Sequence, residues 1–386
     1  MNKVLTSIGI LIMSSMASAA YEDHFPTYFE YCTGTQWKLQ SGEEGGRPGH
    51  GFTYIHGLCK DYRSTYPQVI PCSEVSEDLR TKYPHEGVGV SLDKNFSNVM
   101  WVAVPGRDLT FFGETERKAI THDDVRNIIK KAIDLKIFND VVHKGKKAQE
   151  LPFNSQEYLE EVADATLGTE YAVTWARDLH CAKIPFQASA LKDVANFLNE
   201  ANNQYRSGPS YVWDKISNNC AHLAINTSHQ MGITDIIKTD QPGIKKYFNM
   251  ALPSNTFLMY ADESALAKKP GLKELTRVIN QKGFSRVQVG SIINHYPAYP
   301  SGNKFNTEDL GVLTAPRIKK PLKVFMTPEK YEVRYMTPKN SELEENARSW
   351  KNHYQKLLSQ IKTRKESKVE KYIDDQLEII EKILNQ

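Results

Sequence analysis

The segment Asn218-Asn219-Cys220-Ala221-His222 holds the residues best suited to nucleophilic chemistry. Asparagine is a strong N-cap residue, and the apolar spacing that follows predicts a helix from Cys220 to a stop at Gly232. A cysteine in the first turn faces unpaired N–H groups and the positive end of the helix dipole, which favour the nucleophilic thiolate. We expect the backbone N–H of Cys220, with help from Asn219, to supply an oxyanion site.

A cysteine nucleophile also needs an imidazole within reach, and His50 is the best candidate. His50 stands in a glycine-rich stretch at the mouth of a predicted strand over 52–58. His222 lies two residues after Cys220, roughly 200° around the helix axis, so we expect it to have a structural role. His56 lies about 20 Å along the strand from His50. The pattern predicts Cys220 as nucleophile and His50 as general base and later acid. The plainer alternatives are a buried apolar cysteine and a surface turn histidine.

The number of cysteines singles out the same residue. The chain has five cysteines, and an odd number leaves one unpaired in an oxidising compartment. Cys59 and Cys72 flank a short segment that a hairpin could close. Cys32 and Cys181 would then pair by elimination, although four cysteines allow three pairings. Cys220 is therefore the expected free thiol.

The first residues resemble an export signal. Lys3 gives a positive start, an apolar stretch covers 4–13, and Ala17-Ser18-Ala19 fits the small-residue cleavage rule. We expect a signal peptide over 1–19 and a periplasmic or secreted protein. No later stretch is long and apolar enough for a membrane anchor, so stable membrane insertion is not expected.

Composition narrows the function further. The 386 residues are 25% charged and 40% hydrophobic, with a net charge of +3, and they show no broad basic field that would indicate nucleic-acid binding. The histidines and cysteines lack the spacings of a metal site. We expect no metal and no cofactor.

Hydrophobic periodicity predicts the elements that must position these residues. A short element is expected within 27–40, strands over 52–58, 88–92 and 99–104, and turns at 41–51 and 93–98. Helices are expected over 121–137, 155–165, 171–179, 188–205, 244–250 and 264–267, an extended segment over 253–261, and strands and loops over 288–335.

Residues 339–386 change character, because they are dense in Lys and Glu with apolar residues at helical spacing. A polar gap over 362–371 indicates either one long helix or a helical hairpin. We expect Trp350, Tyr354, Leu357 and Ile361 to pack on the preceding domain. The part after Lys371 is expected to be held more loosely, or to pair with a partner chain as a coiled coil.

A strand-start histidine followed by an Asn-Cys-x-His segment that opens a helix resembles the circularly permuted branch of the papain-like (NlpC-type) cysteine hydrolase superfamily. In that branch the histidine precedes the cysteine, as His50 precedes Cys220 here. The segments 47–61, 87–106 and 211–224 are similar to those of exported bacterial proteins of this kind. The resemblance implies an α+β fold in which a short antiparallel sheet packs on the cysteine-bearing helix. It also implies thiol-dependent hydrolysis or acyl transfer on an amide, thioester or ester.

Two departures from this pattern stand out. The third polar residue that usually steers the histidine has no clear match, and Asp61, Gln68 and Asp93 all remain open. About 160 residues separate the two catalytic segments, so added helices are expected to shape a substrate groove. We divide the chain into a signal peptide (1–19), a permuted papain-like domain with helical insertions (20–338) and a helical tail (339–386).

The leading hypothesis is an exported Cys–His hydrolase or acyltransferase. Peptidoglycan peptides are the first substrate expected, because an enzyme of the bacterial envelope meets them, and lipid or protein acyl groups come next. The competing hypothesis is a non-catalytic envelope or effector protein that binds a partner through residues 339–386.

Overall fold

The computed structural model describes residues 21–37, 44–113, 121–175, 179–214, 218–234, 253–263, 269–280, 288–296, 337–361 and 367–386. The expected signal peptide, the expected helices over 244–250 and 264–267, and most of the 288–335 region lie outside the described residues. No helix within the described ranges is long and apolar enough to cross a membrane.

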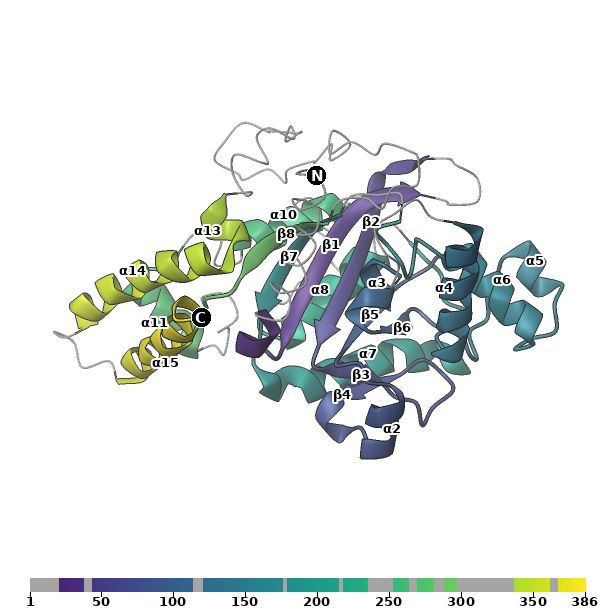
Figure 1. Cartoon of the computed structure of the whole chain (residues 1–386), viewed down its shortest axis with the longest axis horizontal. Helices are drawn as coiled ribbons and strands as arrows, with labels where there is room; N and C mark the ends of the chain where they lie inside the picture. Colours follow the sequence, from purple (N-terminus) through teal and green to yellow (C-terminus); the bar gives the residue numbers. More distant parts are fainter. Residues whose placement is uncertain are drawn as a thin grey trace, which may run out of the picture.

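A six-stranded antiparallel sheet forms the centre of the fold (Figure 1). Its order is β6-β5-β2-β1-β7-β8. The strands are β1 (Tyr28–Trp37), β2 (Glu44–His56), β5 (Gly87–Ser91), β6 (Val102–Pro105), β7 (Leu179–Pro185) and β8 (Ile292–Tyr296). A small second sheet pairs β3 (Leu58–Lys60) with β4 (Val69–Pro71). The expected α+β class with an antiparallel sheet is confirmed.

Side chains that alternate along β1 enter two different cores, because successive residues of a strand point to opposite faces. Phe29 and Tyr31 belong to a core that also holds Leu223 of α8. Tyr28 and Cys32 belong to a second core, which they share with Trp350 of the C-terminal region. The sheet is therefore buried on both faces.

The helices have the following bounds. They are η1 (Cys72–Glu74), α2 (Glu77–Lys82), α3 (Arg107–Phe111), α4 (His122–Asp134), α5 (Lys146–Gln149), α6 (Gln156–Thr166), η2 (Ala188–Ala190), α7 (Leu191–Arg206), α8 (Cys220–Gln230), α10 (Pro253–Glu263), α11 (Leu272–Asn280), α13 (Pro338–Ser341), α14 (Leu343–Ile361) and α15 (Ser367–Leu384). Helices α8 and α10 contact β2, and α7 contacts both α8 and β4.

Local capping explains where several of these helices begin. Thr121 and Asp124 form a capping box at the start of α4, with each side chain bonded to the backbone N–H of the other. The Ser155 side chain accepts a hydrogen bond from the Tyr158 N–H at the start of α6. These polar residues satisfy N–H groups that have no partner inside the helix.

The C-terminal region forms two helices, α14 and α15, that pack on each other at one end of the molecule (Figure 1). Trp350, Tyr354, Leu357 and Ile361 are all at most 3% exposed in the second core, as expected. The expectation that the chain after Lys371 is held loosely is wrong, because Ile373 and Ile380 are fully buried in the same core.

Side chains of α14 and α15 also hold the loop that leads into β8. Asn346 accepts a hydrogen bond from the Gly290 N–H at 3.0 Å and donates to the Ser291 carbonyl at 3.1 Å. Gln376 accepts from the Val289 N–H at 3.1 Å. The C-terminal helices thus supply hydrogen-bond partners for the backbone of residues 289–291. They also supply apolar side chains to the second core.

Several sequence expectations need correction. The glycine-rich turn over 41–51 ends early, because β2 begins at Glu44 and its backbone pairs with β1. Residues 253–261 form helix α10 instead of an extended segment. The strand expected from 99 begins only at Val102, and β7 was not expected at all.

The described residues 171–175 of the helix expected over 171–179 are not helical, for a clear physical reason. The N–H groups of Ala172, Val173 and Thr174 donate to carbonyls of Leu109, Thr110 and Phe111, so they do not form helical bonds. Ala172 also has a φ of 52°, in the left-handed region that a regular helix excludes. Hydrogen bonds to residues 109–111 therefore replace the helical hydrogen bonds that the local sequence pattern predicts.

Both expected disulfides are present. Cys32 in β1 is bonded to Cys181 at the directly paired position of β7, and Cys59 is bonded to Cys72. Among the described cysteines, Cys220 is the one free thiol.

Candidate active site

His50 and Cys220 are brought together by the packing of α8 on β2. His50 lies in β2 opposite Gly34 of β1, and its side chain is 12% exposed. Cys220 is the first residue of α8 and is partly buried. Cys220 is among the neighbours that raise the pKa of His50, so the two side chains lie close together. The structure therefore places the expected nucleophile and the expected base near each other, although they are 170 residues apart in sequence.

Asn219 fixes the start of the cysteine helix. Its side-chain oxygen accepts hydrogen bonds from the N–H groups of Ala221 at 2.9 Å and His222 at 3.1 Å. The ring Nδ1 of His222 lies 2.9 Å from the same oxygen. The N–H groups of Ala221 and His222 are therefore already bonded to Asn219. The Cys220 N–H is the remaining candidate in this first turn for binding an oxyanion. His222 has the structural role expected of it, because it supports the cap.

Glu170 is the charged partner of His50, and sequence reasoning missed it. Its Oε1 lies 3.4 Å from His50 Nε2, an ion-pair contact that lacks the alignment of a hydrogen bond. Its Oε2 accepts a hydrogen bond from the Ser91 hydroxyl, and the residue is 1% exposed. The Glu170 N–H donates to the Thr166 carbonyl at 2.9 Å, which ties the turn to the end of α6. No spacing in the sequence relates this acid to His50.

The environment of His50 favours its charged form. Burial lowers the pKa of His50, but the Glu170 carboxylate and the nearby Cys220 outweigh that effect and raise the pKa to about 10. His50 is therefore an imidazolium at neutral pH. A charged imidazole next to a sulfur can deliver a proton to a leaving group.

Asp61, Gln68 and Asp93 were the three candidates for the polar residue that orients His50, and the structure separates them. Asp61 is bonded to Arg63, with its Oδ1 at 2.8 Å from Arg63 Nε, and Gln68 donates to Asn203 at 3.2 Å. Asp93 alone lies close enough to act on the site. Burial and the charge of Glu170 raise the pKa of Asp93 to about 6, while His50 opposes this shift. The charges of Glu170 and His50 both act on the partly buried Asp93, so these three groups lie near one another.

Two tyrosines lie close enough to Cys220 to respond to its charge. Burial raises the pKa of Tyr31 and of Tyr211, and in both cases negative charge on the nearby Cys220 adds to the shift. Tyr31 crosses the backbone of β2 at Gly51, where an added Cβ atom would overlap the tyrosine hydroxyl. A glycine next to His50 is thus required for the close approach of this ring.

His56 lies apart from this chemistry. Its Nδ1 lies 2.7 Å from the Pro26 carbonyl oxygen, and its ring stacks on Tyr28 with centroids 5.0 Å apart. It packs at the far end of β2, in keeping with the distance expected from the strand geometry.

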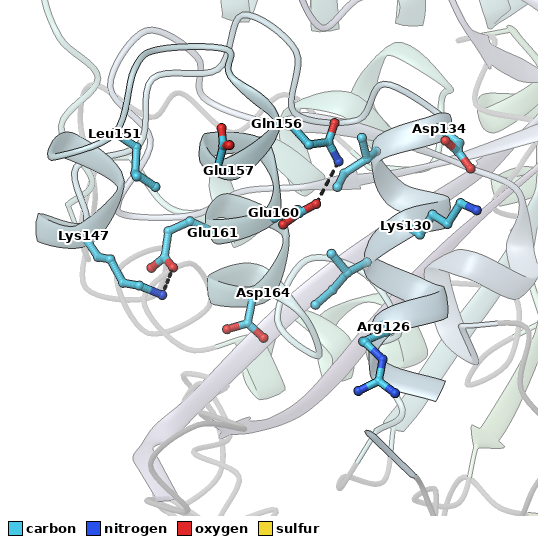
Figure 2. Close-up of a pocket in the computed structure, with 12 residues that line it drawn as sticks. Arg126, Lys130, Asp134, Lys147, Leu151, Gln156, Glu157, Glu160, Glu161 and Asp164 are labelled. Atoms are coloured by element: carbon cyan, nitrogen blue, oxygen red, sulfur yellow. Dashed lines mark hydrogen bonds and ion pairs between the residues drawn. The ribbon is translucent and has the colours of Figure 1, made fainter. Parts of the chain in front are cut away.

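A groove of about 650 Å³ lies between α4 and α6 (Figure 2), with neither His50 nor Cys220 among its lining residues. Arg126 and Lys130 stand on the α4 side, and Glu157, Glu160 and Asp164 on the α6 side. Among its charged side chains, Lys147 is bonded to Glu161. The groove contains no nucleophile, so we place the candidate chemistry at Cys220 instead.

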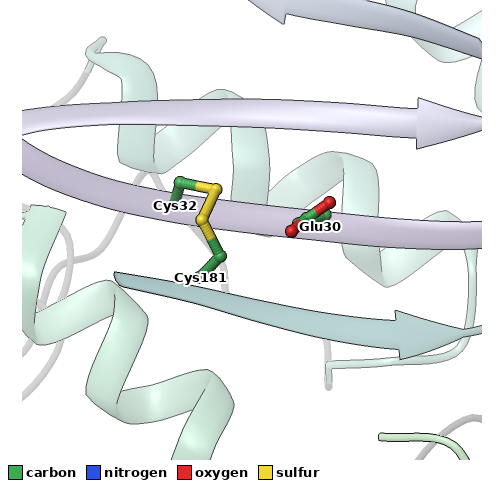
Figure 3. Close-up of side chains that lie close together, drawn as sticks. All are labelled: Glu30, Cys32 and Cys181. Atoms are coloured by element: carbon green, nitrogen blue, oxygen red, sulfur yellow. A yellow bond between two sulfur atoms is a disulfide. The ribbon is translucent and has the colours of Figure 1, made fainter. Parts of the chain in front are cut away.

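Within the described residues, the one cluster of three side chains with metal-ligating atoms consists of Glu30, Cys32 and Cys181 (Figure 3). The two sulfurs are joined in a disulfide, so neither is a thiolate. Glu30 is fully buried and forms an ion pair with Arg107. These groups are already used by the fold, and the cluster does not fit a metal.

Comparisons with protein-family models, with curated proteins and with solved structures found no match to this chain.

Proposed function

We propose that the protein is an exported thiol-dependent hydrolase or acyltransferase of the permuted papain-like type, with Cys220, His50 and Glu170 as its catalytic group. The observation that carries the proposal is that His50 lies 3.4 Å from the Glu170 carboxylate and close enough to Cys220 for that residue to raise its pKa. A nucleophile, an acid–base group and an orienting group in this order are what covalent acyl transfer requires.

The reaction follows from the protonation of His50. The Cys220 thiolate attacks a carbonyl carbon, and the S–C bond forms as negative charge develops on the oxygen. His50 then gives its proton to the leaving amine or alcohol as the C–N or C–O bond breaks, which leaves a thioester. For hydrolysis, the neutral His50 takes a proton from water as that water attacks, and the C–S bond breaks to regenerate the Cys220 thiolate and the His50 imidazolium. A second amine or alcohol in place of water would give acyl transfer.

Glu170 supports this cycle from behind the imidazole. Its carboxylate stabilises the imidazolium form and limits the rotation of the ring, while Ser91 holds the carboxylate from the other side. The first turn of α8 contributes the Cys220 N–H and its helix dipole toward the developing oxyanion.

The substrate expected first is a peptide of the bacterial cell wall, followed by lipid or protein acyl groups. Two disulfides support an oxidising compartment, which is consistent with export. The alternative of a partner-binding tail receives no support from the packing, because the apolar stripe of α14 is occupied by the chain's own core.

Activity screening of matched variants tests the proposal. The wild type, Cys220→Ala and His50→Gln would be incubated with peptidoglycan fragments and with a panel of acyl esters, and products would be identified by mass spectrometry. We expect turnover by the wild type, a covalent acyl adduct on Cys220 in a short incubation, and no adduct in Cys220→Ala. Turnover that persists unchanged in Cys220→Ala would refute the assigned nucleophile. A Cys220 thiol that fails to react with iodoacetamide in the folded protein would favour the non-catalytic alternative.

A further inference from the structure

The groove between α4 and α6 has walls that the fold holds in place. Ala132 of α4 and Val162 of α6 are fully buried in the first core. The Tyr158 hydroxyl of α6 donates to the Val141 carbonyl at 2.8 Å and accepts from the His143 N–H at 2.8 Å. The volume of about 650 Å³ is typical of sites that bind small ligands or short peptide segments. A preformed groove loses little conformational entropy when it binds a ligand.

One part of the groove lining is apolar. Ile129 and Ile133 lie one turn apart on α4, and Leu151 follows the end of α5. All three side chains pack against the first core but are only partly buried. They therefore expose aliphatic surface in the groove, and a ligand that covers this surface gains free energy from its removal from water.

The α6 side of the groove is acidic. Glu157 and Glu160 are exposed and line it, and Figure 2 shows the Glu160 carboxylate in the space between the two helices. Neither carboxylate forms an ion pair with another described residue. Glu160 Oε1 accepts a hydrogen bond from the Gln156 amide at 2.9 Å, which leaves its negative charge in place. The whole chain has a net charge of +3, so this acidity is local to the groove.

The basic residues of the lining do not cancel this negative charge. Lys147 is bonded to Glu161, and Arg126 is paired with Asp123, which lies outside the lining. In Figure 2 the Lys130 side chain extends away from α6. A ligand that complements the groove therefore carries positive charge next to aliphatic groups.

We propose that the groove between α4 and α6 binds a peptide segment in which basic residues alternate with aliphatic ones. The aliphatic side chains cover the apolar part of the lining, and the basic side chains reach Glu157 and Glu160. A simple cation would pair with the acids alone and leave the apolar part uncovered. The inference goes beyond the proposed function and does not depend on the reaction at Cys220.

Fluorescence anisotropy tests the groove in Cys220→Ala, in which the proposed nucleophile cannot cleave a probe. The probes are three pentapeptides with the same fluorescein label, namely Lys-Leu-Lys-Leu-Lys, Lys-Ser-Lys-Ser-Lys and Glu-Leu-Glu-Leu-Glu. We expect the first to bind roughly tenfold more tightly than either of the others, because it alone matches both the acidic and the apolar parts of the lining.

Matched variants locate the binding. Glu157→Gln/Glu160→Gln should weaken binding of Lys-Leu-Lys-Leu-Lys roughly tenfold, and Leu151→Ser should weaken it roughly threefold. The controls are Glu150→Gln and Phe153→Ser, which change an exposed acidic and an exposed apolar residue close to the groove in sequence but outside its lining. Both controls should keep the affinity within about twofold, as surface substitutions usually have small effects.

The opposite results are equally clear. Equal affinity for the three peptides, no saturable binding, or losses in the controls as large as those in the groove variants would overturn the proposed peptide site. The nucleophile is absent from this assay, so its outcome leaves the proposed reaction to be decided by the turnover screen. Loss of turnover in that screen would likewise leave the peptide site standing.

Discussion

Glu170 Oε1 and His50 Nε2 lie 3.4 Å apart, although one residue belongs to the turn after α6 and the other to strand β2. The buried Glu170 carboxylate and the nearby Cys220 both raise the pKa of the imidazole. This ion pair stabilises the charged form of His50, and its loss should change both the activity and the pH dependence of stability.

Replacing Glu170 with glutamine should lower catalytic activity while keeping a side chain of nearly the same size in place. The neutral amide no longer stabilises the imidazolium, so the pKa of His50 should fall from about 10 toward its ordinary value. In the wild type, the rate of any reaction that needs protonated His50 should decline only near pH 10, and in Glu170→Gln that decline should move to lower pH. Turnover at neutral pH should fall roughly a hundredfold. Glu161→Gln, on the neighbouring helix, serves as the control, and an identical pH profile for Glu170→Gln and the wild type would contradict the assignment.

The raised pKa of His50 also makes stability depend on pH. A group whose pKa is higher in the folded protein stabilises it fully below the ordinary pKa of 6.5, and this contribution is lost as the pH rises through about 10. We expect the free energy of unfolding in urea to fall between pH 7 and pH 10 by more in the wild type than in His50→Gln. Parallel curves for the two proteins over this range would show that His50 does not carry the effect.

Asp93→Asn should stabilise the protein in a pH-dependent way. Burial and the charge of Glu170 raise the pKa of Asp93 to about 6, so the folded state loses stability as the pH rises from 3.8 through 6. The asparagine oxygen can still accept the Asn95 N–H bond, which is 2.6 Å long in the wild type. The variant should therefore unfold at higher urea concentration than the wild type at pH 7.5, with little difference near pH 4. A destabilised variant at pH 7.5 would mean that the charge of Asp93 is needed by the fold.

The two disulfides should contribute unequally. Cys32 and Cys181 are 149 residues apart in sequence, whereas Cys59 and Cys72 are 13 apart. In the chain-entropy model a bond that closes the shorter loop contributes about 3 kcal/mol and one that closes the longer loop about 5 kcal/mol. Guanidinium unfolding of Cys32→Ala/Cys181→Ala and of Cys59→Ala/Cys72→Ala measures the difference. A larger loss in the second double variant would show that local geometry outweighs loop length here.

Truncating Trp350 should show how far the C-terminal helices support the catalytic region. Trp350 is fully buried, and Trp350→Ala should lower the free energy of unfolding by about 3 to 5 kcal/mol, because a large cavity replaces the ring. Lys356→Ala on the exposed side of the same helix should change it by less than about 0.5 kcal/mol. The alkylation rate of Cys220 in folded Trp350→Ala should stay within a few-fold of the wild type. A complete loss of reactivity in the folded variant would place α14 in the active site.

The sequence predicted the site better than it predicted the sheet. The helix start at Cys220, its Asn219 cap and the two disulfide pairs could be read from residue types and spacing, because each depends on neighbours in sequence or on a small number of cysteines. Glu170 could not be found in this way, since only the three-dimensional turn after α6 brings it to His50. Strand β7 was missed because it is buried along its whole length and so shows no alternation of buried and exposed residues. Residues 253–261 were expected to be extended, but Pro253 is the first residue of helix α10, a position at which a helix tolerates proline.

The contact between the two ends of the described chain bears on the timing of folding. Tyr21 and Ile383 share one core, and His24 Nε2 lies 3.0 Å from Gln386 Oε1. Because the last helix completes the core that begins beside β1, a chain that emerges from its amino end cannot finish this core until its last turn has appeared. Until then this core lacks the apolar side chains of α15, and part of its surface stays open to water. Copies of the chain that stop before α15 would expose this surface to proteases.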